Sequence, residues 1–166
     1  DQAIDLLEEV LAGLEGIKGI HCCGNTDWSI VFDTSADILS LDAYDYSQRL
    51  ALYPEEAARF LERGGVIAWG IVPTRTVAET ETVESLVKRL HEALNRLVAK
   101  GVSLDALLQA GMVTPSCGLA SITPSLAEHV LELTAGVSAE MRRRYVEGGL
   151  SARSRTSQGE SEASSQ

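Results

Sequence analysis

Apolar residues along the first 150 positions form two kinds of pattern, which predict helices and strands in turn. Helical spacing of three and four residues occurs in five segments: 4–14, 47–63, 80–100, 104–109 and 126–141. Short apolar runs that end in polar or turn residues predict four strands: 17–23, 36–41, 66–71 and 112–114. A further short helix is expected at 26–34. The chain thus reads as one helix followed by four units of strand and helix.

The four predicted strands are too apolar to face water on either side, which is typical of a parallel sheet covered by helices. The sequence therefore predicts an α/β fold. Four strands can form an open doubly wound sheet or half of an eight-stranded barrel, and periodicity does not choose between the two. We expect residues 1–148 to form this unit. Residues 149–166 are rich in serine and have little to bury, so they predict a disordered tail.

Charge and cysteine content narrow the function. The formal net charge is -10, which repels phosphate backbones and anionic lipid headgroups, and no stretch is apolar and long enough to cross a membrane. The chain also starts on acidic residues, where a secretion signal would be basic. We expect a soluble, cytoplasmic protein that binds neither nucleic acid nor membranes. Three cysteines do not form an even disulfide set, which favours reduced thiols and raises the question of a metal.

Groups that bind metals or protons follow three of the four predicted strands. His21 and Cys23 end the first strand, Asp42 follows the second, and Cys117 follows the fourth. The carboxyl ends of parallel strands share one rim of the sheet, so these residues should lie on the same rim. Side chains alternate along a strand; His21 and Cys23 should therefore point to one face, and Cys22 should pack on the other.

This set of residues has a functional and a structural interpretation. One imidazole and two thiolates suit zinc, and three protein ligands leave the fourth tetrahedral position for a carboxylate, water or substrate. Equally, a cysteine often acts as a small hydrophobic residue, and Asp42 can accept hydrogen bonds from backbone N–H groups in the turn before Tyr44. Spacing alone leaves both interpretations open. His91 and His129 lie within amphipathic helices, and we interpret them as parts of solvated helix faces.

Four segments resemble a known family in the same order along the chain. They are HCCGN at 21–25, DILSLD at 37–42, WGIVP at 69–73 and TPSCGL at 114–119. Together they resemble the C-terminal catalytic barrel of cobalamin-independent methionine synthase, within a superfamily that includes uroporphyrinogen decarboxylase and the corrinoid-dependent methyltransferases. The resemblance implies the C-terminal half, four strand-helix units, of a TIM (βα)8 barrel.

The resemblance also implies a site and an activity. It carries the family's zinc ligands onto His21, Cys23 and Cys117, and it places Asp42, our candidate catalytic residue, where the family has a glutamate ligand. The shorter carboxylate either ligates zinc or leaves the ion with three protein ligands. Val72 stands where the family has a histidine thought to assist catalysis. The implied reaction moves a methyl group from methylfolate or a methylated corrinoid protein to a small-molecule thiol such as homocysteine or coenzyme M.

Four strands cannot close a barrel, so the barrel-facing side chains need a cover. We expect a missing N-terminal half-barrel or a partner chain to supply it. Two other functions stay open. One is a metal-free decarboxylase of the uroporphyrinogen type, which would have no use for the histidine and two cysteines together. The other is a non-enzymatic half-barrel that binds a corrinoid protein or a partner chain.

Overall fold

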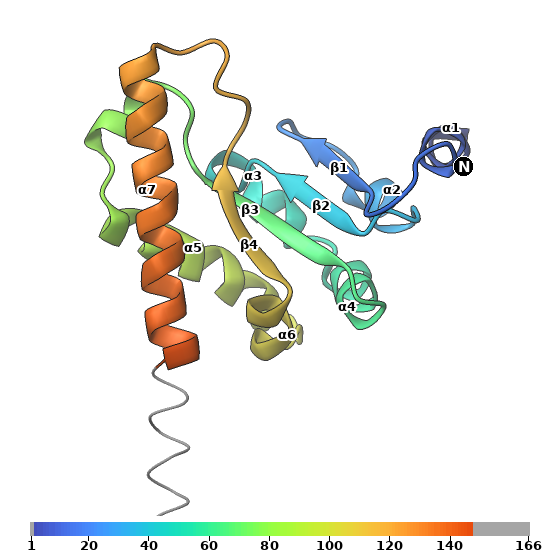
Figure 1. Cartoon of the computed structure of the whole chain (residues 1–166). Coiled ribbons are helices and arrows are strands. Elements are labelled where there is room, and N and C mark those ends of the chain that lie inside the picture. Colours follow the sequence, from blue (N-terminus) through green and yellow to red (C-terminus); the bar gives the residue numbers. More distant parts are fainter. Residues whose placement is uncertain (1, 148–166) are drawn as a thin grey trace, which may run out of the picture.

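The computed structural model describes residues 2–147, which form one parallel sheet with helices packed against it (Figure 1). The strands are β1 (Gly19–Cys22), β2 (Ile38–Leu41), β3 (Val66–Val72) and β4 (Gly111–Pro115). The α-helices are α1 (Gln2–Ala12), α2 (Trp28–Phe32), α3 (Ala43–Leu50), α4 (Pro54–Glu62), α5 (Val83–Val98), α6 (Leu104–Gln109) and α7 (Pro124–Arg142). A 3-10 turn, η1 (Thr76–Thr80), precedes α5, and a π-helical turn, η2 (Arg143–Glu147), follows α7.

The strand order confirms the predicted α/β class with a parallel sheet. Each strand pairs in parallel with the strand that follows it along the chain, in the order β1-β2-β3-β4. A doubly wound sheet reverses its strand order at a switch point, whereas a barrel adds its strands in sequence. This topology is consistent with part of a TIM-barrel-like unit. The predicted tail at 149–166 lies outside the described residues.

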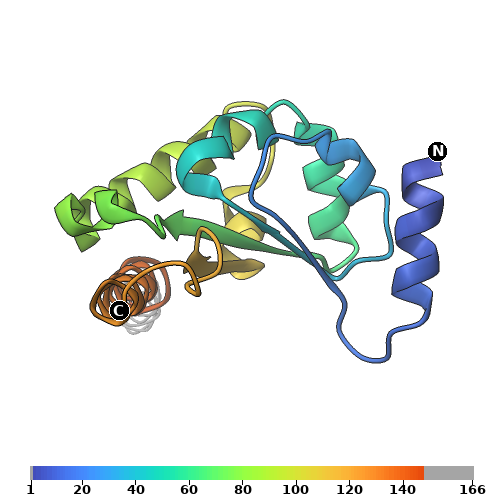
Figure 2. The same cartoon turned by 90° about the horizontal axis from the view of Figure 1, so that it is seen from above.

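The two faces of the sheet differ in what covers them. On one face the strands meet the helices α2 to α5 (Figure 2). The buried strand side chains in this core are at most 2% exposed, and they are Leu39, Leu41, Ile67, Trp69, Ile71 and Val72. Residues at the alternate positions of β1, β2 and β4 point to the opposite, open face, and His21 and Ser40 are among them.

One helix boundary corrects the sequence prediction. Residues 47–63, expected as a single helix, form the end of α3 and all of α4. Pro54 causes the break, because proline lacks an N–H group and disfavours helical backbone at the preceding residue. Tyr53 accordingly has φ -119° and ψ 56°. The apolar stripe continues across the break because α3 and α4 both bury one side in the same core.

The last helix packs against α5 and against β4, the strand at one edge of the sheet (Figure 1). A glycine in the middle of α7 permits this close approach. A Cβ on Gly136 would lie 2.6 Å from the Cγ2 atom of Val83 at the start of α5. A larger residue at 136 would therefore push α7 away from α5.

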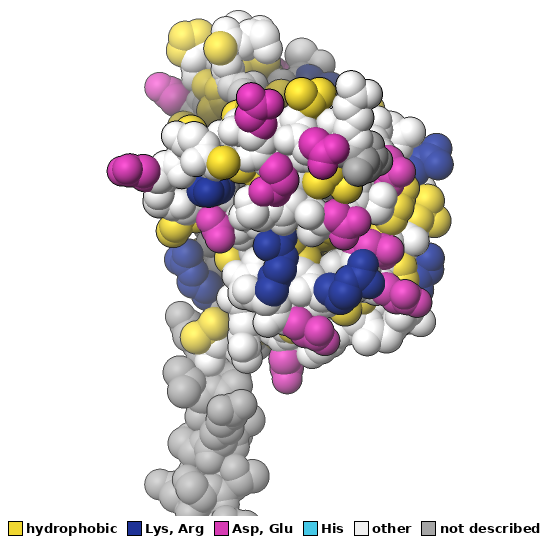
Figure 3. Space-filling view, turned by 90° about the vertical axis from the view of Figure 1, so that its right-hand side faces the viewer, with side chains coloured by type: hydrophobic (Ala, Val, Ile, Leu, Met, Phe, Trp, Pro, Cys, Tyr) yellow, Lys and Arg dark blue, Asp and Glu magenta, His cyan; other side chains and the backbone are white. Residues whose placement is uncertain are grey.

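On the face seen in Figure 3, acidic and basic side chains are interspersed. The chain as a whole has more acidic than basic residues. None of the helices in residues 2–147 is long and apolar enough to span a membrane.

Candidate metal centre

Three of the residues expected at the rim come together in the structure. The candidate ligand atoms of His21, Cys23 and Cys117 all lie within 4.8 Å of one another. His21 lies near the end of β1 and Cys23 follows that strand directly. Cys117 comes just beyond β4, where the Ser116 N–H group donates to the Val72 carbonyl at 2.8 Å and extends the pairing with β3. All three side chains are at least partly exposed, so an ion and a substrate have access to them.

The meeting of these residues requires a strongly curved sheet. β1 and β4 are the two outer strands, with β2 and β3 between them. In a flat sheet, three strand spacings would separate them by roughly 14 Å. The side chains of Cys23 and Cys117 nevertheless meet. Curvature toward the open face, together with the short segments that follow each strand, brings the two edges together at this rim.

Cys22 takes no part in the cluster. Its side chain is half-buried and packs against the helix-covered core, together with Ile20. Its Sγ atom lies 3.6 Å from the carbonyl oxygen of Gly24. The alternation predicted for residues 21 to 23 is therefore seen, with His21 and Cys23 on one side of the strand and Cys22 on the other.

The thiol of Cys117 affects the ionisation of the neighbouring Cys23. A side-chain hydrogen bond with Cys117 is the main cause that raises the pKa of Cys23, and repulsion between the two thiolates adds to it. A coordinating metal ion supplies positive charge that favours the thiolate form of its cysteine ligands. One imidazole nitrogen and two sulfur atoms form a donor set that fits zinc.

Asp42 lies on the same rim but outside the group of three. Its carboxylate caps α3, accepting a hydrogen bond from the Asp45 N–H group at 2.9 Å. The residue is only 6% exposed, and this burial is the main cause that raises the pKa of its carboxyl group. The structure therefore shows the turn-capping role that the sequence left open. Zinc ligation by Asp42 stays a prediction.

Ser40 is a polar residue at the site that sequence reasoning did not single out. Its Oγ atom lies 2.8 Å from Nδ1 of His21. The two residues are direct neighbours in the parallel pairing of β1 and β2. The predicted strands end at Cys23 and Leu41, and aligning them by those ends would have paired His21 with Leu39, so the pairing with Ser40 is known only from the structure.

A second group braces the loops beside this rim. The Tyr44 hydroxyl donates to Glu81 at 2.6 Å, and the Arg89 guanidinium lies 4.1 Å from the centre of the Tyr44 ring. Arg75 forms two hydrogen bonds with Asp45, at 2.8 and 3.0 Å. These contacts tie the start of α3, which Asp42 caps, to the segments that follow β3.

The other two histidines are half-buried, which corrects their interpretation as parts of solvated faces. Nε2 of His129 lies 3.2 Å from the Ala78 carbonyl oxygen. His91 is bonded to the Tyr145 hydroxyl at 2.8 Å, and burial is the main cause that lowers its pKa. Both histidines thus connect α7 and η2 to neighbouring elements, and neither belongs to the metal-ligand cluster.

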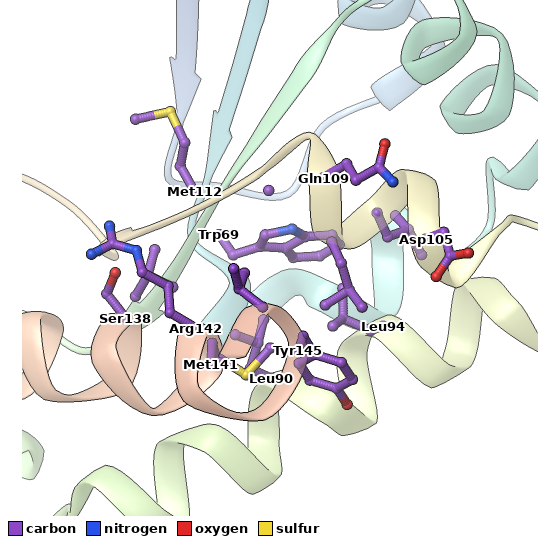
Figure 4. Close-up of a pocket in the computed structure, with 15 residues that line it drawn as sticks. Trp69, Leu90, Leu94, Asp105, Gln109, Met112, Ser138, Met141, Arg142 and Tyr145 are labelled. Atoms are coloured by element: carbon purple, nitrogen blue, oxygen red, sulfur yellow. The ribbon is translucent and has the colours of Figure 1, made fainter. Parts of the chain in front are cut away.

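A cavity of about 430 Å³ lies at the opposite end of β4 from Cys117, between that strand and α5, α6 and α7 (Figure 4). Trp69 and Leu90 form part of its apolar lining, with Met112, Arg142 and Tyr145 among the other residues around it. None of the candidate zinc ligands lines this cavity. The metal-ligand cluster and the cavity are therefore separate features.

Comparison with known proteins connects this geometry to a fold. No protein-family model matches the chain, and no curated protein matches it. Among solved structures, it is similar to a B12-independent methionine synthase from Shewanella sp. W3-18-1 in complex with selenomethionine, with a TM-score of 0.59 and 21% sequence identity. The likeness shows a shared fold. It covers 87% of this chain and 44% of the other, so the chain spans less than half the length of that methionine synthase.

Proposed function

We propose that this chain contributes the zinc-binding half of a thiol methyltransferase barrel. The observation that carries the proposal is the meeting of His21, Cys23 and Cys117 at one rim, although the histidine and the first cysteine come from one edge of the sheet and the second cysteine from the other. A core cysteine that only filled space would not need to lie at a partly exposed rim beside a second cysteine and a histidine. The similarity in fold to a methionine synthase also supports this proposal.

The donor set defines the chemistry. Zinc, when bound, supplies a Lewis acid that lowers the pKa of a thiol substrate. His21, Cys23 and Cys117 would hold the ion, and three protein ligands would leave room for a substrate, as catalytic rather than structural zinc sites do. Asp42 is the candidate for a further ligand or for a carboxylate beside the bound thiol. The hydrogen bond from Asp45 holds its carboxylate at the start of α3, and ligation would have to share or replace that bond.

We also infer that a further half-barrel, in the same polypeptide or in a partner chain, completes the unit. Most of the exposed large apolar side chains belong to the segment that precedes β1 or to the surroundings of β4. They are Leu6, Val10, Leu14 and Ile17 before β1, and Met112, Tyr145 and Val146 beside β4. Outer strands with free edges and apolar neighbours are typical of surfaces that another element covers. The methyl donor, methylfolate or a methylated corrinoid protein, would bind against that completed barrel.

The proposal is tested by binding of a thiol to the metal. The longest natural form of the chain is loaded with Co²⁺, whose visible absorption reports its ligands, and is titrated with homocysteine and with coenzyme M. Homoserine, which has a hydroxyl in place of the thiol, is the matched control. We expect a thiol, and not homoserine, to add a sulfur-to-metal band, and we expect the same thiol to be methylated when methylfolate or a methyl-corrinoid is supplied. If neither thiol changed the spectrum of the Co²⁺-loaded protein, the proposed thiol methyltransferase function would be contradicted.

A further inference from the structure

We propose that Ser40 is a positioning residue that fixes the tautomer of His21, with the proton on Nδ1 and with Nε2 left free to bind zinc. This inference rests on the proposed function, because it assigns a role within the same metal centre. The observation behind it is the contact of 2.8 Å between His21 Nδ1 and Ser40 Oγ.

The contact follows from the register of the sheet. β1 and β2 run in parallel, with His21 directly beside Ser40 and Cys22 directly beside Leu41. Side chains of directly paired residues point to the same face of a sheet. Leu41 is fully buried in the helix-covered core, so the pair of His21 and Ser40 lies on the open face. The backbone thus presents the serine hydroxyl to the imidazole without any further loop or helix.

The chemistry of a neutral imidazole makes this contact decisive. One ring nitrogen carries a proton and donates, and the other has a lone pair that accepts a hydrogen bond or binds a metal. A serine oxygen that accepts the Nδ1 proton leaves the lone pair on Nε2. The reverse arrangement, in which Ser40 donates to Nδ1, would put the proton on Nε2 and prevent that nitrogen from binding zinc.

The Ser40 hydroxyl is available for this role. Among residues 2–147 it makes no hydrogen bond other than the one with His21. The histidine side chain is exposed and needs such a partner, because an exposed ring rotates freely between orientations. Partners of this kind orient metal-bound histidines in many proteins, and their loss typically lowers metal affinity by about 10- to 100-fold.

The first test compares zinc affinity across a set of Ser40 variants, measured on the reduced full chain by competition with a coloured chelator. Ser40→Ala and Ser40→Val remove the hydroxyl, and Ser40→Thr keeps it while matching the size and shape of valine. Ser138→Ala, a serine on α7 at the cavity away from the site, is the matched control. We expect about 10- to 100-fold weaker binding for the alanine and valine variants, and affinity close to the parent for the threonine and control variants. Equal affinity in all four variants would overturn the inference.

A structural readout separates positioning from general destabilisation. The chain has only three histidines, so nitrogen-proton correlation spectra of the imidazoles can follow His21 when zinc is added. We expect a protonated Nδ1 and a metal-bound Nε2 in the parent, with unfolding temperatures of the metal-free variants close to that of the parent. Zinc on Nδ1 would overturn the inference while leaving the zinc site intact. A parent that binds no zinc would overturn the proposed function and the role of Ser40 with it.

Discussion

The two faces of this sheet are built from adjacent residues of the same strands, yet they have different tasks. In β2, Leu39 and Leu41 are completely buried beneath the helices, while Ser40, between them, lies on the open face beside His21. In β1, Cys22 packs against the core and its neighbours His21 and Cys23 join the metal-ligand cluster. Successive side chains of a strand point to opposite faces, so one residue stabilises the core while the next can contribute to the metal site.

The reactive groups lie on the rim and the open face of the sheet, where they contribute little to packing. They can be thiols, an imidazole and a hydroxyl because the helix-covered face supplies the burial that holds the strands in register. Substitutions on the two faces should accordingly have different consequences. The buried face should respond in the free energy of unfolding, and the open face in metal affinity.

The largest expected stability effect comes from the buried face. Leu41→Ala should lower the free energy of unfolding by about 2 to 5 kcal/mol, because Leu41 is fully buried and the surrounding core can collapse only partly around the lost volume. Urea denaturation followed by circular dichroism measures the change. Ser40→Ala, one residue away, should change stability by no more than about 0.5 kcal/mol. Similar losses for both variants would contradict the separation of the two faces.

A smaller effect is expected at the junction of rim and core. Asp42→Ala removes the side-chain cap of α3 and should cost about 1 kcal/mol. Asp42→Asn keeps a capping oxygen and removes a buried charge, so it should be at least as stable as the parent at neutral pH. Thermal unfolding of the metal-free proteins distinguishes the two. If the asparagine variant were the less stable one, the cap would not explain the position of Asp42.

On the open side, Met112 is 47% exposed and should be nearly neutral toward folding. Met112→Ser is expected to change the free energy of unfolding of the isolated chain by about 0.5 kcal/mol or less. Leu107→Ser, at a fully buried position of α6 by the same cavity, is the matched comparison and should cost several times more. A large cost at Met112, dependent on protein concentration, would show that copies of the chain already cover this edge.

The smallest effect concerns the pH dependence of folding at His91. Burial is the main cause that lowers the pKa of His91 in the fold, so below a pH of about 6.5 the unfolded chain takes up a proton that the folded chain resists. Stability from this group should therefore be complete above that pH and decline as the pH falls toward the lowered pKa. His91→Gln should reduce the slope of unfolding temperature against pH in that window. An unchanged slope would contradict the assignment to His91.

Much of this arrangement could be predicted from the sequence, because it depends on local patterns. The strands and the long helix α5 follow from apolar spacing, and α6 begins and ends at the expected residues. The alternation around Cys22 also follows from strand geometry alone. The proximity of Cys23 and Cys117 could only be inferred from the shared rim and the family resemblance, since it depends on the curvature of the whole sheet.

The predictions that were wrong or missing have one physical cause. Periodicity describes each helix or strand by itself and contains no information on the elements that pack against it. It merged α3 with α4 across Pro54 because both helices bury the same side. Periodicity predicted an exposed His91, because its contact with Tyr145 comes from an element more than fifty residues away. It missed Ser40 because a serine in a strand becomes informative only once the pairing with His21 is known.

Whether His21, Cys23 and Cys117 form a zinc site is best decided by the zinc content of each chain, determined by elemental analysis of purified, reduced protein. The parent is compared with Cys22→Ser, Cys23→Ser and Cys117→Ser, of which the first alters a neighbouring cysteine outside the cluster. We expect close to one zinc per chain in the parent and in Cys22→Ser, and loss of zinc in the other two variants while all four proteins remain folded. A folded, reduced parent without zinc, or equal loss in Cys22→Ser, would contradict this zinc site.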